Sequence, residues 1–440
     1  MTLPHTLAQA RSALDEGRLT SVDLVAAVQG SIEARESSVQ ALVCTTYEMA
    51  MDQAVKADAR LAAGERTPLL GIPLVLKDLV DVAGVPTTAG SKVLADNVPT
   101  DSSVVWSRLE AAGSVLIGKA NTHEFAYGGT TEPTRNPADT SRIVGGSSGG
   151  PAAALAAAYC LGAVGTDTAG SIRIPANLCG VPALKPTRGL VPSGGVVPLS
   201  QTLDVVGPMA RSVADLAPLL SVMAAIEAGP ARRPRSVGLL QGTFPEAQSV
   251  SRAVADTAAV LRRLGIEVVD VELPGFTESV FDDFTVIGFE ATIIHQQWKD
   301  HRHLYTPYVR ERLAAAAEVT LQQYEDALRA GERLGRAVDD LLEQVDVLLL
   351  PGVPFPASPA YDEQVDVDGQ WEDRDTGLCR NTAFANLTGH PVLALPAGLD
   401  GLLPVGVQLV GRRGADFDLV DLGSHLEALL PPGLPPALRD

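Results

Sequence analysis

Gly145-Gly-Ser-Ser-Gly-Gly150 and Gly165-Thr-Asp-Thr-Ala-Gly-Ser-Ile-Arg173 flank the small-residue run from Pro151 to Cys160, and this region says most about the architecture. Glycine removes the Cβ that would prevent a strained or closely packed backbone, and the serines supply hydroxyl groups. A flexible linker would not continue directly into an apolar run. The pattern therefore predicts a loop, then a helix over 151–160, then a strand over 161–165.

Strands and helices alternate on both sides of this region. Short apolar runs bounded by turn residues predict further strands at 72–76, 114–117, 237–240, 267–271, 345–350 and 405–410. Helical periodicity predicts helices within 5–65, at 101–112, at 248–264 and over 307–344, whereas the Pro-, Asp- and Gly-rich residues 352–378 predict a long surface loop. We therefore expect one large α/β domain, 1–440, in which a central, mixed, largely parallel twisted β-sheet is covered by helices on both faces.

The composition excludes several classes of protein. Of 440 residues 46% are apolar, and 53 acidic residues outnumber 34 basic ones, so the net charge is −19. The apolar content excludes intrinsic disorder, and the acidic balance argues against a nucleic-acid partner. The longest apolar stretch, 151–165, is shorter than the roughly 20 residues of a membrane span, so no membrane partner is expected. Four dispersed cysteines and an N-terminus without a signal-peptide pattern favour the reducing cytoplasm.

Three features of the sequence carry chemistry. Lys77 ends the apolar run 71–77, and burial at the end of a strand lowers the pKa of a lysine; an ion pair with Asp78 or Asp81 is the alternative. The serine loop 145–150 offers hydroxyls and free backbone N–H groups at a helix N-terminus. The turn 165–173 contains successive N–H groups that can form a nest for an oxyanion, with Ser171 at its end.

Three other patterns compete with this interpretation. Residues 145–149 match the G-x-S-x-G nucleophile elbow of α/β-hydrolases, which also needs a later acid and histidine. Five histidines are available, but none stands in a convincing triad pattern: His295, His301, His303, His390 and His425. Residues 113–120 resemble a P-loop but end in alanine in place of Ser or Thr. His301 and His303 lack a third ligand at a usual spacing, so no metal is expected.

Taken together, these residues resemble the amidase signature family. The resemblance covers nearly the whole chain and is densest over 71–215. Its motifs are GIPLVLKD (71–78), HEFAYG (123–128), RNP (135–137), GGSSGG (145–150), GTDTAGSIRIPA (165–176), ALKPTRG (183–189), LDVVGPMARSVAD (203–215), FANLTGHPVLALPAG (384–398) and LPVGVQLVG (403–411). The resemblance implies the amidase signature fold, with N-terminal helices in 1–65, the signature core in 66–215, and the rest of the sheet with variable pocket segments in 216–440.

For the mechanism, the resemblance implies a Ser–cis-Ser–Lys triad. Ser171 is then the nucleophile, Lys77 the base, and Ser147, preceded by a cis peptide bond, the serine that bridges them. Ser148 would support this relay with a hydrogen bond, and Asp167 and Arg173 would brace the loop as an ion pair. The expected oxyanion donors are the backbone N–H groups of Thr168, Ala169, Gly170 and Ser171. Ala169 stands where many members have glycine, which adds a Cβ near the oxyanion.

The function implied is that of an amidohydrolase that cleaves a carboxylic amide through an acyl-serine intermediate, releases ammonia or an amine, and needs no cofactor. The alternative within the same resemblance is the glutaminase component, or A subunit, of an aminoacyl-tRNA amidotransferase. The residues after Met209 lack the aromatic, Ser-rich stretch of that protein, which favours the stand-alone hydrolase. A non-catalytic binding protein of this fold would have lost Lys77, Ser147 or Ser171, and all three are present.

The partner expected is a small-molecule amide. The segments 124–131, 284–310 and 355–382, where family motifs are absent, are expected to shape the pocket. Candidate wall residues are Glu124, Tyr127, Phe289 and Trp298, with ordinary packing as the alternative. Arg380 would meet either an anionic substrate group or an acidic neighbour such as Asp375. A homo-oligomer is compatible with the sequence.

Overall fold

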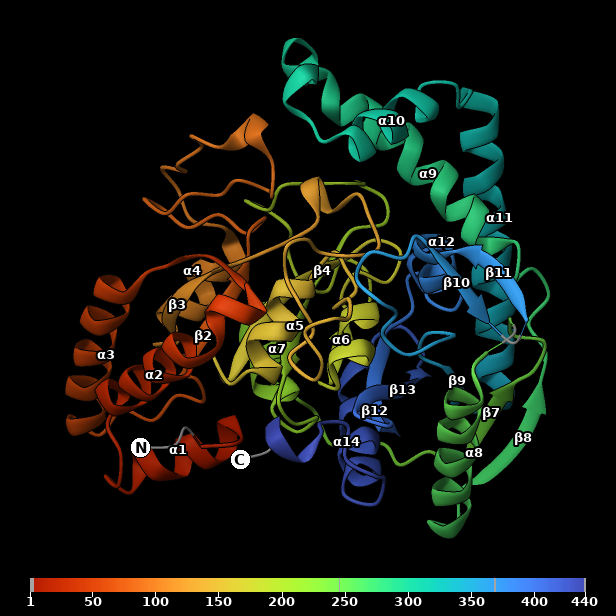
Figure 1. The fold of residues 1–440 in the computed structure, drawn as a ribbon. Helices are drawn as coiled ribbons and strands as arrows, with labels where there is room; N and C mark the ends of the chain where they lie inside the picture. The colour runs from red at the N-terminus through yellow and green to blue at the C-terminus, as the bar shows by residue number, and fades with distance from the viewer. Residues whose placement is uncertain (1–3, 245, 368, 439–440) are drawn as a thin grey trace.

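The computed structural model describes residues 4–244, 246–367 and 369–438, and its centre is an eleven-stranded sheet (Figure 1). From one edge to the other the strands are β1 (Leu42–Thr45), β3 (Val115–Ala120), β2 (Pro73–Lys77), β4 (Gly162–Asp167), β6 (Val205–Ala210), β5 (Ala183–Lys185), β12 (Val392–Asp400), β13 (Leu403–Val410), β9 (Val347–Pro351), β7 (Ser236–Leu240) and β8 (Glu267–Val271). A separate antiparallel pair, β10 (Gln364–Val367) and β11 (Gln370–Asp373), lies outside this sheet.

The sheet is mixed, as expected, but its parallel pairings are fewer than expected. Parallel pairs join β2 to β3 and β4, and β7 to β8 and β9. The strands between these two groups, in the order β4-β6-β5-β12-β13-β9, pair antiparallel. A short connection explains one of these pairs, because β12 ends at Asp400 and β13 begins at Leu403. Only antiparallel strands can be joined by so short a turn, because parallel strands need a crossover of a dozen or more residues.

Helices cover both faces of the sheet (Figure 1). They are α1 (Leu7–Asp15), α2 (Ser21–Val39), α3 (Tyr47–Ala62), α4 (Val104–Ala111), α5 (Gly149–Ala156), α6 (Arg173–Cys179), α7 (Leu216–Ala224), α8 (Gln248–Arg263), α9 (Ser279–Ile294), α10 (Pro307–Ala316), α11 (Leu321–Gln344), α12 (Arg374–Cys379), α13 (Phe384–Thr388) and α14 (Asp416–Glu427). Among the residues described, no helix is both long and apolar enough to cross a membrane.

The alternation of side chains along β2 sets up the site. Leu74 and Leu76 belong to the core on the face covered by α4, α7, α8 and α14, whereas Val75 belongs to the core formed with α5 and α6. Successive strand residues point to opposite faces. Lys77 therefore points to the same face as Val75, toward the loop that precedes α5.

The glycine-rich loop reaches this position because its backbone packs closely against its neighbours. Helix α5 begins at Gly149, two residues before the expected start, and every one of its residues is buried. A Cβ on Gly150 would lie 2.4 Å from the backbone N and O of Asn121, which follows β3. Only glycine fits there, so the loop can approach the end of β3 and place Ser147 beside the neighbouring strand β2.

Two expectations about the C-terminal half were wrong. The helical stretch expected over 307–344 is two helices, α10 and α11, because Thr320 and Gln323 form a capping box that starts the second one. The surface loop expected over 352–378 instead contains β10, β11 and most of α12. Several of its apolar side chains, among them Val353 and Phe355, are buried in a core that also includes residues of α6 and α9. That segment therefore lies against the site.

Candidate active site

Lys77 is fully buried at the end of β2 and contacts hydroxyl groups. Its Nζ donates hydrogen bonds to Ser147 Oγ at 2.7 Å and to Thr166 Oγ1 at 2.8 Å. No ion pair joins Lys77 to a carboxylate among the residues described, and Asp78 pairs with Lys119 at 3.3 Å instead. Burial lowers the pKa of Lys77 to about 7, although Asp204 and Asp167 act to raise it. A large fraction of this lysine is therefore neutral near pH 7.

The two adjacent serines of the loop have different contacts. The Gly146–Ser147 peptide bond is cis, as the resemblance implied, and Ser147 is fully buried. Ser148 Oγ donates to Thr166 O at 3.0 Å, and Ser148 N donates to Ser171 O at 3.0 Å. Ser148 therefore ties the serine loop to the end of β4 and to the turn that carries Ser171.

Ser171 lies in the turn after β4, and its side chain lines a cavity. The N–H groups of Thr168, Ala169 and Ser171 have no hydrogen-bond acceptor within the part of the chain that the structure describes. Gly170 differs from the expectation, because its N–H donates to Asp167 Oδ1 at 3.0 Å and is already engaged. A Cβ on Gly170 would lie 2.2 Å from Thr382 Oγ1. Gly170 thus shapes the turn, while its three neighbours offer donors toward an oxyanion.

The expected pair of Asp167 and Arg173 is present and fully buried. Arg173 donates to Asp167 from Nη2 at 2.8 Å and from Nε at 3.0 Å. Burial alone would raise the pKa of Asp167, but Arg173 and its neighbours lower it to about 2. The remaining donors of Arg173 go to Thr382 O, Gln408 Oε1 and Asn386 Oδ1. This network connects the turn that bears Ser171 to β13 and α13.

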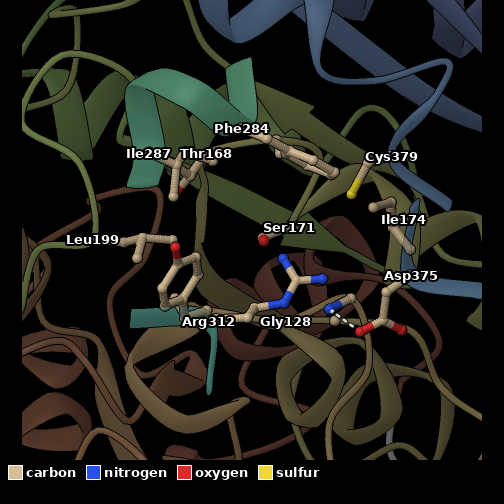
Figure 2. A pocket seen from close by; sticks show the side chains of 15 residues that line it. Gly128, Thr168, Ser171, Ile174, Leu199, Phe284, Ile287, Arg312, Asp375 and Cys379 are labelled. Atoms are coloured by element: carbon tan, nitrogen blue, oxygen red, sulfur yellow. Dashed lines mark hydrogen bonds between the residues drawn. The ribbon is translucent and has the colours of Figure 1, made fainter. Parts of the chain in front are cut away.

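The cavity is small, about 60 Å³, and opens beside Ser171 (Figure 2). Each segment expected to shape the pocket contributes to its wall, as does the turn after β4. The lining residues are Ala126, Tyr127, Gly128, Gly129, Gly146, Thr168, Ala169, Ser171, Ile174, Leu199, Phe284, Ile287, Arg312, Asp375 and Cys379. No histidine is among them.

Of the wall candidates chosen from the sequence, only Tyr127 lines this cavity. The carboxylate of Glu124 instead accepts hydrogen bonds from Ser91 and from the backbone and hydroxyl of Thr306, at the N-terminus of α10. Phe289 stacks on Tyr324, and Trp298 packs against Phe125 and His295. Arg380 pairs with Glu372 rather than with Asp375. These four residues support the walls without reaching the cavity.

Arg312 and Asp375 bring opposite charges to the cavity beside the serine. Arg312 lies between three aromatic rings, 4.9 Å from the ring centre of Tyr308, 5.8 Å from that of Tyr127 and 5.9 Å from that of Phe284. Figure 2 shows its guanidinium directed into the cavity near Ser171. Within the described residues it forms no ion pair. Arg312 is partly exposed, and the charge of Asp375 acts on it without an ion pair, so its donors remain available to an anionic ligand.

Asp375, in contrast, is held by the protein. It accepts hydrogen bonds from Tyr308 Oη at 2.5 Å and from Gly129 N at 3.2 Å, and it contacts Arg374 Nε at 3.3 Å. Burial acts to raise its pKa, but the hydrogen bond from Tyr308 and the charge of Arg374 keep the pKa below its usual value. Asp375 is therefore ionised at neutral pH.

The sequence pattern had not pointed to Arg312, Cys379 or Asp204, and it named Asp375 only as a neighbour for Arg380. Arg312 follows Tyr308 by four residues, a spacing that places both on one helix face, but this pattern is equally typical of an exposed helix. Asp204 lies in the motif 203–215 and accepts hydrogen bonds from Thr168 Oγ1 at 2.6 Å and Leu199 N at 2.9 Å. The motif was the one available signal for it.

The alternatives drawn from histidine patterns find no support in the geometry. His295 contacts Tyr305 Oη, and His390 contacts Asp339. Ser147, the serine of the G-x-S-x-G match, is hydrogen-bonded to a lysine. Within the described ranges no group of three or more His, Cys, Asp or Glu side chains is arranged to hold a metal ion.

Comparisons with known proteins identify the family of this chain. The model of the Amidase family matches residues 23–420. The chain therefore belongs to the amidase signature family, whose members are serine amidases that hydrolyse C–N amide bonds. Amide hydrolysis, expected from the motifs, is confirmed as the reaction class.

Relatives within the family include both hydrolases and a component of an amidotransferase. The A subunit of the glutamyl-tRNA(Gln) amidotransferase of Roseiflexus sp. (strain RS-1) is 37% identical over 96% of each chain. An amidase of Pseudomonas putida is 38% identical over 90% of each chain. A crystal structure of an amidase superposes with a TM-score of 0.91 at 35% identity and covers 97% of this chain and 100% of that chain.

Proposed function

We propose that Ser171, Ser147 and Lys77 are the nucleophile, the bridging serine and the base of this amidase. The observation that carries the proposal is the 2.7 Å hydrogen bond between Lys77 Nζ and Ser147 Oγ, inside the protein and next to a cavity that Ser171 lines. Neutral Lys77 accepts the proton of Ser147 Oγ, and Ser147 in turn accepts the proton of Ser171 Oγ. The oxygen of Ser171 then attacks the amide carbon, because an alcohol needs such a base to become a good nucleophile.

The attack turns the amide carbonyl oxygen into an oxyanion. The N–H groups of Thr168, Ala169 and Ser171 stabilise this charge, and losing one such donor typically costs about 100- to 1000-fold in rate. Collapse breaks the C–N bond, and the leaving nitrogen receives the proton held by the relay. The acyl group remains on Ser171 as an ester. Water then attacks the ester through the same relay, which releases the carboxylic acid and restores the Ser171 hydroxyl.

The substrate we propose is a small amide that carries a carboxylate. The cavity is about 60 Å³ in volume, and the guanidinium of Arg312 reaches it with five donors in a planar fork. Three aromatic rings hold that guanidinium in place. A carboxylate on the substrate would give Arg312 a direct ion pair and orient the amide toward Ser171.

A second candidate function is that of the glutaminase component of an amidotransferase, which would pass ammonia to a partner protein. It is favoured by the relative from Roseiflexus and by Asp375, because Arg312 and Asp375 together suit a substrate with both a carboxylate and an ammonium group. A stable complex with a second protein, purified from the native host, would favour this candidate over the stand-alone hydrolase. The proposed location of either is the cytoplasm, and four free cysteines support it.

Labelling with a fluorophosphonate, followed by peptide mapping, tests the assignment of the triad. We expect the label on Ser171 in the wild-type protein and its loss in Lys77→Ala and Ser147→Ala. Lys92→Ala, at a lysine away from the cavity, is the matched control and should label normally. Label on Ser147 would contradict the assignment, as would undiminished labelling of Ser171 in Lys77→Ala.

A further inference from the structure

Asp204 joins two walls of the cavity. It directly precedes β6, which pairs antiparallel with β4 so that Val205 lies opposite Asp167. The carboxylate accepts hydrogen bonds from Thr168 Oγ1 at 2.6 Å and from Leu199 N at 2.9 Å. Thr168 belongs to the turn that carries the oxyanion donors, and Leu199 lines the cavity. One carboxylate therefore sets the position of the oxyanion turn relative to the wall at Leu199.

The segment from Leu199 to Asp204 is anchored at a second point as well. Glu290 of α9 accepts hydrogen bonds from Ser200 Oγ at 2.5 Å and from the backbone of Thr202 at 3.0 Å. Helix α9 also supplies Phe284 and Ile287 to the cavity. The segment is thus held between a substrate-facing helix and the oxyanion turn, and Asp204 makes the contact with the turn.

Asp204 is also the carboxylate near Lys77 whose charge is least compensated. Asp204 and Asp167 are the two acidic groups whose charges act on Lys77. Asp167 is neutralised by its ion pair with Arg173, and Lys185 adds further positive charge beside it. Asp204 has only hydroxyl and amide donors as contacts within the described residues, and no ion pair.

Other charged groups nearby compensate one another or are neutral. Asp78, next to Lys77 in sequence, pairs with Lys119. Asp283 of α9 is close enough for its charge to interact with that of Asp204, but burial without any hydrogen bond raises its pKa well above the usual value and favours its neutral form. Burial raises the pKa of Asp204 to about 6, so it is mostly ionised at the pH at which Lys77 titrates.

We propose that Asp204 is a positioning residue of the amidase reaction: it fixes the oxyanion turn through Thr168, and its negative charge stabilises the ammonium form of Lys77. This inference rests on the proposed role of Lys77 as the base. Because the negative charge stabilises the ammonium form of Lys77, the enzyme needs a higher pH to become active. The same side chain fixes the position of the backbone N–H groups that bind the oxyanion.

The two effects can be separated by the pH profile of kcat/KM. Asp204→Asn removes the charge. We expect the acid limb of the profile, the range in which kcat/KM rises with pH as Lys77 loses its proton, to move to lower pH by about one unit. This is the size of a charge effect over several ångströms at an effective dielectric constant of about 20. We also expect kcat to fall about tenfold. The two groups that donate to Asp204 are Thr168 Oγ1 and Leu199 N, and the amide NH₂ of Asn would face one of them and lose that hydrogen bond. Thr168→Val leaves the carboxylate of Asp204 in place but removes a donor that lowers its pKa. In this variant kcat should therefore fall, while the acid limb should move less than in Asp204→Asn.

Asp339→Asn, at a partly exposed carboxylate that contacts Arg413, is the control for removal of one negative charge and should leave the profile unchanged. An unmoved acid limb in Asp204→Asn would overturn the inference. Should that variant fail to fold, Asp204→Glu keeps the charge and must keep the acid limb; a downward shift there would equally overturn it. A wild-type enzyme without any acid limb, or an active Lys77→Ala, would instead refute the proposed triad itself.

Discussion

Lys77 and Ser147 are seventy residues apart in sequence, yet their side chains meet at 2.7 Å with neither exposed to solvent. Burial disfavours the ammonium ion, and the partner at this distance is a hydroxyl that gives the charge no counter-ion. The contact therefore places a lysine that is neutral to a large extent near physiological pH beside an oxygen whose proton it can accept.

The activity should rise with pH and reach a plateau. The pKa of Lys77 is about 7, and only its neutral form accepts a proton. Below this pH, kcat/KM should fall tenfold for each pH unit, and above about pH 8 it should be constant. Steady-state kinetics from acidic to alkaline pH would check this. A rate that fell steadily above neutrality would contradict Lys77 as the base.

Replacement of Lys77 by methionine should stabilise the fold while abolishing activity. The pKa of Lys77 is lower in the folded protein than in the unfolded chain, about 7 against 10.5, so the unfolded chain binds the proton more tightly. This group therefore costs stability that is regained as pH rises from about 7 to about 10.5. At pH 7 we expect Lys77→Met to increase the free energy of unfolding by about 2 kcal/mol. This net value includes the cost of removing the donor that the hydroxyls of Ser147 and Thr166 share.

Urea unfolding at neutral pH and at about pH 9.5 measures this gain, which should be smaller at the higher pH. Lys92→Met, at a lysine that is not fully buried, is the matched control and should change the free energy of unfolding by less than about 0.5 kcal/mol. A loss of stability in Lys77→Met at neutral pH would contradict the lowered pKa.

The ion pair of Asp167 and Arg173 should matter far more for stability than a surface pair of the same length. Asp167→Asn leaves the buried Arg173 without its counter-charge, and we expect a loss of about 3–5 kcal/mol. Arg329 and Asp326 also lie 2.8 Å apart, but on the surface. Asp326→Asn should cost less than about 1 kcal/mol. Equal losses for the two variants, measured by urea unfolding, would show that burial is not the deciding factor.

Arg312 should select substrates by charge. Arg312→Met removes the guanidinium from the cavity, so KM for a carboxylate-bearing amide should rise about 10- to 100-fold, the range expected for loss of a charge-assisted hydrogen bond. A neutral amide of the same size should be affected much less. Arg310→Met, at an exposed arginine of the same helix, is the control. A similar loss for both amides would mean that Arg312 supports the wall rather than binding substrate.

Local pattern accounts for much of the fold. The strands expected at 72–76 and 267–271 correspond closely to β2, which is buried, and to β8, which lies at the edge of the sheet. Short runs rich in apolar residues between turn residues favour strands in both positions. The prediction of a loop at 352–378 was wrong because it too was based on local pattern. The many Pro, Asp and Gly residues of this segment predict a loop and outweigh its few apolar side chains. These apolar side chains are buried by residues far away in sequence, which a local pattern does not include.

By itself, the sequence determined the family and the reaction class, and it placed the three residues of the proposed relay, Lys77, Ser147 and Ser171, in motifs that can be read locally. Tertiary structure alone decided that Arg312 enters the cavity while Arg380 does not, and that Gly170 donates to Asp167 instead of offering its N–H. It also decided that Asp204 lies beside the oxyanion turn. The physical reason is that charge state, burial and unpaired donors are properties of an environment, which exists only once distant segments have packed together.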